Sequence, residues 1–405
     1  MPGDGDTPPS SPLTGRSLPV GLLVLVSAVV FVDTTFYTAI TPLLPQYTHA
    51  LHLGKSGAGI LVGAYPAGTL LAAIPSGFLA SRIGVRPAVI AGLFLMSVAT
   101  LTFGYSHQAG LLDLARFVQG IGGSCTWAGG LAWLASATDP SRRAGALGIA
   151  FSAAVGGSLC GPIIGTLASR VGTGPAFAGA TAASVVLILG TFLVGVPGTA
   201  EARPLRSLLV AVRDPGLLGG LWLTSLAGLG FGVVDVLIPL RLSALKASAV
   251  MIGIAFLAAA ALDGALAPVL GRVADRRGRL VPARWSVALA VLTALVLPWV
   301  APAALLMAAS IVGFPVFGTL FVPAAAMTSD GAERQGLPQG LGFGLSNLAW
   351  AGGQAVAAGG SGALAQVTDD VVPFLLLAAL FLGTSLLLQR RDVLRAMLAS
   401  SPAKQ

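Results

Sequence analysis

The sequence GFLASRIGVR at residues 77–86 returns in variant form as GRVADRRGRL at residues 271–280, which is 194 positions later. Each copy closes a long apolar run with a short basic turn, and another apolar run follows it. Pro45 and Pro239 are separated by the same 194 positions. At a spacing of 196, three glycines of one apolar run match three of another: Gly148, Gly156 and Gly157 against Gly344, Gly352 and Gly353. We therefore predict that the chain is a duplicated unit.

The composition places this unit in a lipid bilayer. Of the 405 residues 55% are hydrophobic and 9% are charged, which is too little polar surface to cover a soluble globule of this size. About 20 apolar residues cross a bilayer as a helix. Twelve such runs occur, at residues 17–44, 57–80, 87–105, 109–136, 142–168, 175–197, 216–242, 248–271, 280–300, 303–329, 337–365 and 370–389. We predict an all-α membrane protein with twelve transmembrane helices.

The basic residues predict the orientation of these helices. If both termini are cytoplasmic, most of the 23 Lys and Arg residues fall in cytoplasmic segments, and only Lys55, Arg170, Arg241 and Lys246 fall in outer loops. This asymmetry is typical of membrane proteins. We expect a multi-pass protein of the plasma membrane, which is the inner membrane in a bacterium. The net charge of +8 is then a topology signal, and its spread over many loops does not favour binding to nucleic acid.

The duplication also predicts the domain organisation. We expect a disordered tail at residues 1–16 and a bundle of six helices at 17–197. A hydrophilic connector at 198–215 leads to a second bundle of six helices at 216–390, and a cytoplasmic tail covers 391–405. The sequence of the connector is compatible with a soluble linker and with a helix that lies on the inner membrane surface.

The two basic turns resemble a loop motif of the major facilitator superfamily, G-x-L-a-D-R-x-G-R. The second copy supplies it with Gly271, Asp275, Arg276, Gly278 and Arg279. The first copy keeps Gly77, Arg82, Gly84 and Arg86. The resemblance implies two pseudo-symmetric six-helix bundles around a cavity that opens alternately to each side, and a monomer. Ser81 stands where the family has an acid that helps to close the cytoplasmic side, so the first copy of the motif is incomplete.

The run at 142–168 resembles the antiporter signature of drug/proton exchangers. The matching positions are Gly148, Gly157, Gly161, Pro162 and Gly165, while Thr166 replaces a second glycine. Small residues allow a partner helix to approach closely, and Pro162 removes a backbone donor and kinks the helix. The resemblance implies antiport; generic packing of small residues is the alternative.

The run at 17–44 carries Asp33 about halfway along, with Tyr37 on the same helical face. An unpaired carboxylate in lipid is costly and would instead take up a proton, which makes Asp33 a candidate for proton coupling or cation binding. Its spacing to Pro42 and Pro45 is similar to the first helix of tetracycline exporters and vesicular monoamine transporters. In those relatives the matching acid serves cation binding or coupling. A structural acid that caps a neighbouring helix is the alternative.

Arg116 lies inside the run at 109–136, where a charge must face partners or water. With Gln119 it resembles the R-x-x-q-G element of the family, and Trp127 continues the same helical face. We expect Arg116 to act on the charge of Asp33. A local pair with Asp113, three residues earlier, is the alternative.

Other polar residues within apolar runs are additional candidates. Asp235 lies near the outer end of its run and could be hydrated, so we expect Asp263 to be the more deeply buried acid. Both could bind a proton or a cationic solute. Asn347, Trp350 and Gln354 share a helical face, which could line a cavity or make ordinary interhelical hydrogen bonds.

Together these features predict a secondary active transporter that exports a small amphipathic or cationic molecule in exchange for protons, as in multidrug efflux. Because the sequence has no ATP-binding motif, an ion gradient must drive transport. A proton-coupled importer and a polytopic membrane enzyme are alternatives, opposed by the glycine pattern and by three His residues scattered over outer loops: His49, His52 and His107. We expect no metal and no cofactor. The predicted partners are the solute, protons and the bilayer.

Overall fold

The computed structural model describes residues 20–195, 214–337 and 339–390. Its helices follow the twelve predicted runs. They are α1 (Val20–Thr38) with η1 (Thr41–Leu43) and α2 (Leu44–Ala50), α3 (Lys55–Ile83), α4 (Val85–Tyr105), α5 (Ala109–Ala137), α6 (Pro140–Val171), α7 (Thr173–Leu193), α9 (Pro215–Ala244), α10 (Ala249–Arg277), α11 (Leu280–Val296) with η2 (Leu297–Trp299), α12 (Ala303–Gly318) with α13 (Phe321–Arg334), α14 (Gln339–Val367) and α15 (Val371–Gln389). The predicted tails and nearly all of the predicted connector lie outside the described residues.

The surface of these helices suits a bilayer. Ten segments of the described chain are long and apolar enough to cross a membrane. The two remaining long helices, α5 and α14, contain 29 residues each and carry more glycine and polar side chains. Large apolar side chains point outward on the peripheral helices; Phe192 on α7 is 62% exposed and Leu193 is 89% exposed. Such a surface is stable only against lipid. The prediction of an all-α membrane fold is confirmed.

Two of the predicted helices are interrupted, which the sequence analysis did not predict. The first run breaks after Thr38, and the chain resumes as η1 and α2 around Pro42 and Pro45. The run at 303–329 breaks at Thr319 and Leu320, shortly after Pro315. Proline lacks a backbone donor, so each break leaves carbonyl groups that need other partners in a bilayer.

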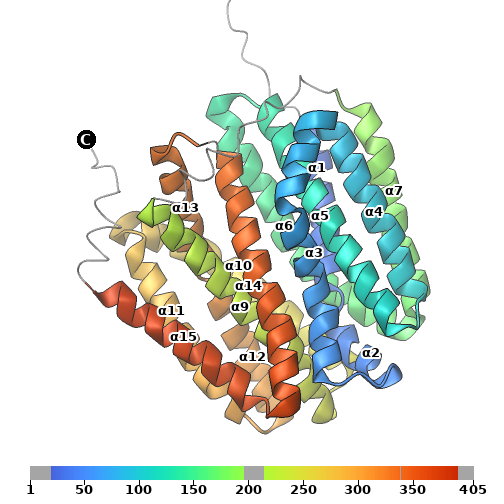
Figure 1. Cartoon of the computed structure of the whole chain (residues 1–405), viewed down its shortest axis with the longest axis vertical. Coiled ribbons are helices and arrows are strands. Elements are labelled where there is room, and N and C mark those ends of the chain that lie inside the picture. Colours follow the sequence, from blue (N-terminus) through green and yellow to red (C-terminus); the bar gives the residue numbers. More distant parts are fainter. Residues whose placement is uncertain (1–19, 196–213, 338, 391–405) are drawn as a thin grey trace, which may run out of the picture.

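The two bundles, coloured blue to green and green-yellow to red, lie side by side in Figure 1, and they repeat the same contacts. In the first, Gly157 of α6 lies directly against the carbonyl of Phe31 on α1. In the second, Gly353 of α14 lies against the carbonyl of Ser225 on α9, and Phe31 and Ser225 are themselves 194 positions apart. The contact pattern thus follows the duplication down to single backbone atoms.

Arginines close the last helix of each bundle in the same way. Arg86 donates to the carbonyl of Val194 just beyond α7. Arg284 donates through Nε and Nη2 to the carbonyl of Leu388 near the end of α15, at 3.1 and 2.9 Å. Both arginines satisfy carbonyl groups that a helix end leaves without an internal partner.

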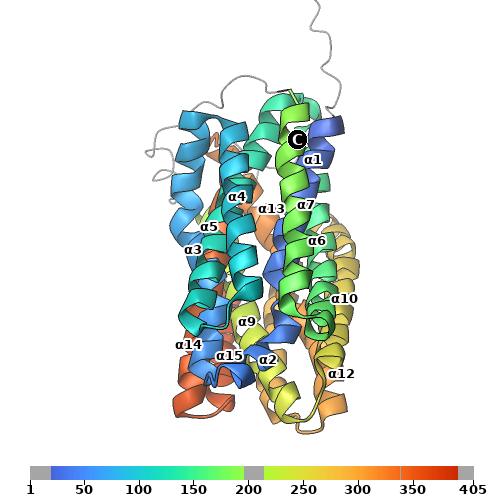
Figure 2. The same ribbon diagram turned by 90° about the vertical axis from the view of Figure 1, so that its right-hand side faces the viewer.

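We call the end of the molecule with the turns at residues 81–86, 277–284 and 334–337 the basic end, and the end with residues 51–54, 245–248 and 368–370 the opposite end. Gly84 and Gly278 occupy equivalent turns at the basic end with φ of +95° and +83°, which favour glycine. The predicted tight turns are therefore present. Figure 2 shows α2 at the opposite end, which is the lower end of the view.

At the basic end, Asp214 begins α9 and fixes it to α13. Its Oδ1 accepts a hydrogen bond from the backbone of Leu217 at 2.8 Å, and Arg334 donates to both carboxylate oxygens at 3.0 and 2.7 Å. Burial raises the pKa of Asp214, but these hydrogen bonds outweigh it and hold the pKa below its ordinary value. The N-cap and the ion pair thus join the two helices.

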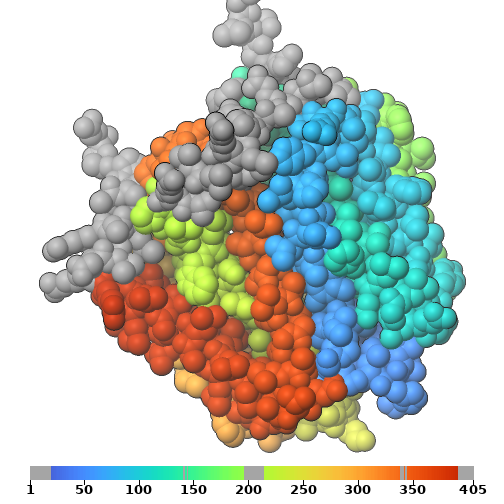
Figure 3. All heavy atoms as spheres, viewed as in Figure 1, coloured from blue at the N-terminus to red at the C-terminus, as the bar shows by residue number. Residues whose placement is uncertain are grey.

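The bundles touch from the opposite end to the middle of the molecule. Lys55 Nζ lies 2.6 Å from Asp370 Oδ1, and the backbone of Ser56 donates to Gln366 Oε1 at 2.8 Å. Gly59 of α3 then packs against the backbone of α14, and the two helices run side by side in Figures 1 and 3.

The glycines of α6, α10 and α14 differ in how closely another helix approaches them. Gly253 and Gly264 of α10 still face α6, at Thr166 and Val155. By contrast, a Cβ atom at Gly148, Gly271 or Gly344 would meet nothing within 4 Å. The bundles are thus joined by direct contacts at the opposite end, while these three glycines at the basic end have open space.

Candidate functional site

Asp33 lies in the middle of the first bundle and accepts two hydrogen bonds. Tyr65 Oη on α3 donates to Asp33 Oδ1 at 2.8 Å, and Trp127 Nε1 on α5 donates to Oδ2 at 2.6 Å. The side chain is 2% exposed. Gly123 on α5 leaves room for this arrangement, because a Cβ atom there would lie 2.8 Å from Asp33 Oδ1. The carboxylate is thus positioned by three helices.

Arg116 holds the broken end of α1. Its Nη1 donates to the carbonyl of Phe36 and to Gln119 Oε1, at 3.2 and 3.1 Å, and its Nη2 donates to the carbonyl of Tyr37 at 3.2 Å. These carbonyls lie where the helix stops at Thr38 and lack the usual helical partners. Within the described chain Arg116 forms no ion pair with Asp33 or Asp113. The alternative of a local Asp113 pair is therefore wrong, and the effect of Arg116 on the charge of Asp33 stays a prediction.

Asp235 on α9 is joined to the first bundle. Gln354 Nε2 on α14 donates to Asp235 Oδ2 at 3.0 Å, and Tyr37 Oη on α1 lies 3.5 Å from the same oxygen. Gln354 also contacts Tyr37 Oη directly. Asp235 is 9% exposed, so the expectation that it would be hydrated is wrong. The reason is that Tyr37 of α1 and Gln354 of α14 cover its carboxylate.

Aromatic rings surround the two carboxylates. The Tyr37 ring centroid lies 5.0 Å from that of Tyr65 and 5.4 Å from that of Trp350. The buried Oε1 atom of Gln354 has no hydrogen-bond partner in the described structure. Carboxylates and an amide oxygen accept hydrogen bonds, and ring faces attract cations. The cluster has the chemistry of a site for an organic cation.

Some predicted residues lie outside this cluster. Asn347 is partly exposed and makes no hydrogen bond within the described chain. Asp263 is also partly exposed, so the expectation that it would be the more deeply buried acid is wrong. Arg82, Asp275 and Arg276 are exposed at the basic end, and Ser81 bonds only to its own helix, at the carbonyl of Phe78.

The remaining motif residues have structural contacts. Arg279 donates to the carbonyl of Ala326 at 2.8 Å and pairs with Asp330 on α13. Gly161 and Gly165 lie against α1 at Thr38 and Ala39, and the carbonyl of Pro162 lies near Gly253 of α10. The predicted close approach of this helix to a partner is confirmed, and the partner is the helix that carries Asp33.

Tyr65 and Thr100 also belong to the cluster but were not predicted from the sequence. Tyr65 holds Asp33, and Thr100 Oγ1 accepts from Gln119 Nε2 at 2.8 Å. Tyr65 stands just before Pro66 within an apolar run, and a phenol in such a run usually has a partner, which could have indicated its role. Thr100 carries no such signal, because threonine often bonds to its own helix backbone.

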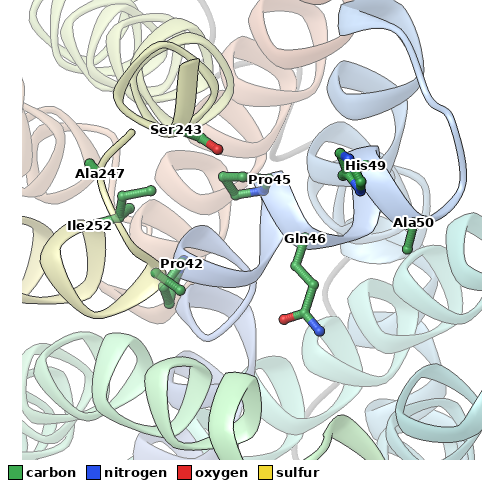
Figure 4. Close-up of a pocket in the computed structure, with 9 residues that line it drawn as sticks. Pro42, Pro45, Gln46, His49, Ala50, Ser243, Ala247 and Ile252 are labelled. Carbon is green, nitrogen blue, oxygen red and sulfur yellow. The ribbon is translucent and has the colours of Figure 1, made fainter. Parts of the chain in front are cut away.

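A pocket of about 350 Å³ lies at the opposite end, beyond the break in α1. Figure 4 shows its walls, formed by Pro42, Pro45, Gln46, His49 and Ala50 from the first bundle and by Ser243, Ala247, Ala249 and Ile252 from the second. It lies between the two bundles, and none of its lining residues belongs to the carboxylate cluster.

The chain is similar to known transporters. The sequence pattern of the Major Facilitator Superfamily matches residues 26–358. The synaptic vesicular amine transporter of Bos taurus is 30% identical over 215 residues, which cover 50% of this chain and 40% of the relative. That of Mus musculus is 28% identical over 260 residues, 61% of this chain and 48% of the relative. The chain thus matches less than half the length of these relatives.

A solved structure shows the same fold. It is a bacterial homologue of the human lysosomal transporter Spinster in an inward-facing and unoccupied conformation, with a TM-score of 0.70, 12% identity, and coverage of 95% of this chain and 98% of that one. The pattern match covers most of the chain, and the fold agrees with it. The chain belongs to the major facilitator superfamily of membrane transporters.

Proposed function

We propose that this protein is a proton-coupled antiporter that exports a small organic amine, or a similar amphipathic cation, across the plasma membrane. The observation that carries the proposal is the pair of buried carboxylates, Asp33 and Asp235, which stand on different bundles within one set of aromatic rings. The basic end is then cytoplasmic, and the solute enters from that side.

The charges of the cluster favour a cation. Asp33 and Asp235 would contribute two negative charges when ionised, and Arg116 contributes one positive charge. A monocation between the acids would make the buried set neutral, whereas an anion would increase the imbalance. Burying uncompensated charge in a low-dielectric site is costly. At acidic pH, protons can also bind these acids and weaken the binding of a cation.

The relatives support an amine as the solute. Two similar proteins are named synaptic vesicular amine transporters, and a probable vesicular acetylcholine transporter of Danio rerio is 31% identical over 153 residues, 36% of this chain and 31% of that protein. The glycine row of α6 resembles the antiporter signature. Exchange for protons would also allow export without ATP.

The test is transport of radiolabelled tyramine by purified protein in liposomes with an acidic interior. We expect amine to accumulate inside as protons leave, with a limit of about tenfold per proton for each pH unit. Asp33→Asn and Asp235→Asn should each reduce the accumulation to the protein-free level.

Asp113→Asn is the matched control, because Asp113 lies on α5 but outside the cluster, and it should keep full activity. Wild-type protein that moves amine in the same direction as protons would establish symport and refute the proposed exchange. A wild type that moves no amine or other organic cation under either gradient would refute the solute class.

A further inference from the structure

A third carboxylate lies in the middle of the membrane-spanning helices, apart from the cluster. Asp263 is the fifteenth of the 29 residues of α10, so about four turns of helix separate it from either end. Its carboxylate lies directly against Gly318, where α12 ends, and a side chain at position 318 would collide with both of its oxygens. The carboxylate therefore faces α12 at the interruption in the tenth predicted helix.

Asp263 is partly exposed, and the described side chains of α12 on either side of Gly318 are apolar or have other partners. Phe256, two turns earlier on α10, packs on Phe314 of α12 with ring centroids 5.3 Å apart. Phe317, next to Gly318, is fully buried. The nearby hydroxyl of Thr319 is engaged with Ser286 Oγ at 2.8 Å and with the carbonyl of Val316. No hydrogen bond to the Asp263 carboxylate occurs in the described part of the chain.

Charged groups of the neighbouring described helices do not replace the missing hydrogen bonds of Asp263. The helices packed on α10 are α6, α9, α11, α12 and α13, together with η1. Neither α12 nor η1 has a titratable residue. The other four carry Arg142, Arg143, Cys160 and Arg170 on α6, Asp235 and Arg241 on α9, Arg284 on α11, and Asp330, Glu333 and Arg334 on α13. None of these described groups forms an ion pair with the Asp263 carboxylate.

The three mid-membrane acids thus differ in their partners. Asp33 accepts hydrogen bonds from Tyr65 and Trp127, and Asp235 accepts one from Gln354. Asp263 has none. Hydrogen-bond donors stabilise the ionised form of a carboxylate, and an acid without them in apolar surroundings is stable only with a proton bound. The first two acids are equipped to hold a cation, and Asp263 is equipped to hold a proton.

The position of Asp263 links it to the movement of the bundles. The next residue, Gly264, faces Val155 of α6, so this part of α10 lies at the interface between the bundles. A change in the relative position of the bundles would change the access of water to α10 beside Asp263. The Asp33–Asp235 cluster is connected to the same region. Phe231 lies one turn before Asp235 on α9, and its ring centroid is 4.7 Å from that of Phe314, which also packs on Phe256.

We propose that Asp263 is the proton carrier of the exchange and that Asp33 and Asp235 hold the solute, so that the two cargoes use different carboxylates. This rests on the antiport function proposed above. The proton is taken up by the Asp263 carboxylate from water on the opposite side and is released to water at the basic end when the solute binds.

The experiment separates exchange from coupling in the liposome assay with radiolabelled tyramine. We expect Asp263→Asn to keep tyramine counterflow, the exchange of labelled for unlabelled amine without a pH gradient, within about twofold of the wild type. Its accumulation driven by an acidic interior should fall from about tenfold per pH unit to no accumulation. Asp33→Asn should lose both activities, and the control Asp113→Asn should keep both.

Each result has one meaning. If Asp263→Asn accumulates tyramine under the pH gradient like the wild type, Asp263 is not the proton carrier. If it is folded by size-exclusion chromatography and loses counterflow as well, the separation of the two sites is refuted. Asp263→Ser, which is smaller, replaces it if the amide disturbs packing on Gly318. If the wild type shows no gradient-driven accumulation, the proposed antiport itself fails, independently of Asp263.

Discussion

Asp33 and Asp235 are supported in different ways. The partners of Asp33, Tyr65 and Trp127, belong to its own bundle, so this half of the cluster keeps its geometry when the bundles move. Asp235 shares Gln354 with Tyr37 of the other bundle, so its surroundings depend on how the bundles sit. We infer that the contribution of Asp33 to solute affinity stays the same when the bundles move, whereas the contribution of Asp235 changes with their relative position.

This difference gives a prediction for Tyr65→Phe. The variant keeps the ring but removes the hydrogen bond to Asp33 Oδ1, so the ionised acid loses a donor and competes less well for a cation against a proton. A hydrogen bond to a charged group contributes about 1.5–3 kcal/mol, and we expect the KM for tyramine to rise at least about tenfold. The increase should be larger at acidic than at alkaline pH.

Tyr105→Phe is the control, because Tyr105 is 60% exposed at the end of α4 and should leave the KM unchanged. A KM for Tyr65→Phe equal to that of the wild type at every pH would show that Tyr65 does not support the ionised form of Asp33.

At this scale the sequence predicted the charged residues of the site but not their partners. Asp33 and Arg116 could be recognised because a charge within an apolar run needs a reason. Thr100 could not, since threonine often bonds to its own helix backbone. For Tyr65 the available signal was a phenol within an apolar run, which usually has a partner. Asp235 was misjudged because its depth along its own helix does not show that Gln354 of α14 and Tyr37 of α1 pack against it.

At the scale of elements, glycine rows determine which helices pack together. Gly157, Gly161 and Gly165 bring α6 against α1, and Gly353 brings α14 against α9. Helix pairs in lipid gain stability from close backbone contact, since there is no hydrophobic effect between them. The glycine pattern of the sequence therefore predicted a real contact. It did not predict the breaks, because proline in a membrane helix is tolerated wherever other groups satisfy the freed carbonyls, as Arg116 does.

Four substitutions test these rows together. Gly157→Ala and Gly353→Ala each place a methyl group against a backbone carbonyl of the neighbouring helix, and we expect each to destabilise the protein by about 1–3 kcal/mol. Gly148→Ala and Gly344→Ala are the matched controls on the same two helices. They have open space, and alanine favours a helix over glycine by about 1 kcal/mol, so stability should be kept or increased.

Thermal unfolding in detergent, followed by size-exclusion chromatography, measures all four variants. If the two pairs have equal effects, close backbone packing at the duplicated positions does not determine stability. If only one member of the first pair is destabilising, the duplicated contacts are not equivalent in energy.

At the scale of the whole molecule, the ion pair of Lys55 and Asp370 joins the bundles at their closed end. Both side chains are partly exposed, so its contribution to closure is about 0.2–1 kcal/mol. Lys55→Asp should therefore increase opening of that end by up to about fivefold. The double variant Lys55→Asp with Asp370→Lys restores an ion pair and should restore closure.

A cysteine at Ala358 can report this opening, because Ala358 is fully buried against Gly59 of the other bundle. The native Cys125 and Cys160 are first replaced by alanine. The rate of labelling by an impermeant maleimide should rise in Lys55→Asp and return in the double variant. Equal rates in all three proteins would show that the pair does not hold the end closed.

The overall architecture was the most predictable part. Twelve apolar runs, one repeat spacing and the positions of the arginines were sufficient for the helices and their two bundles, because lipid permits few solutions other than helices. The contacts between the bundles had no signal in the sequence. These contacts depend on the relative position of the two bundles, and a motif within one helix carries no information about that position.

The cross-bundle hydroxyl of Tyr37 has a final consequence. Arg116 and the glycines of α6 hold α1 within the first bundle. Tyr37 Oη of the same helix nevertheless contacts Gln354 and Asp235 of the second bundle. If the bundles separate at Tyr37, the proposed solute site would be divided, with Asp33 on one bundle and Asp235 on the other. Separation of the two acids would then release the solute. A cation that binds both acids too tightly would hold the bundles together and inhibit transport.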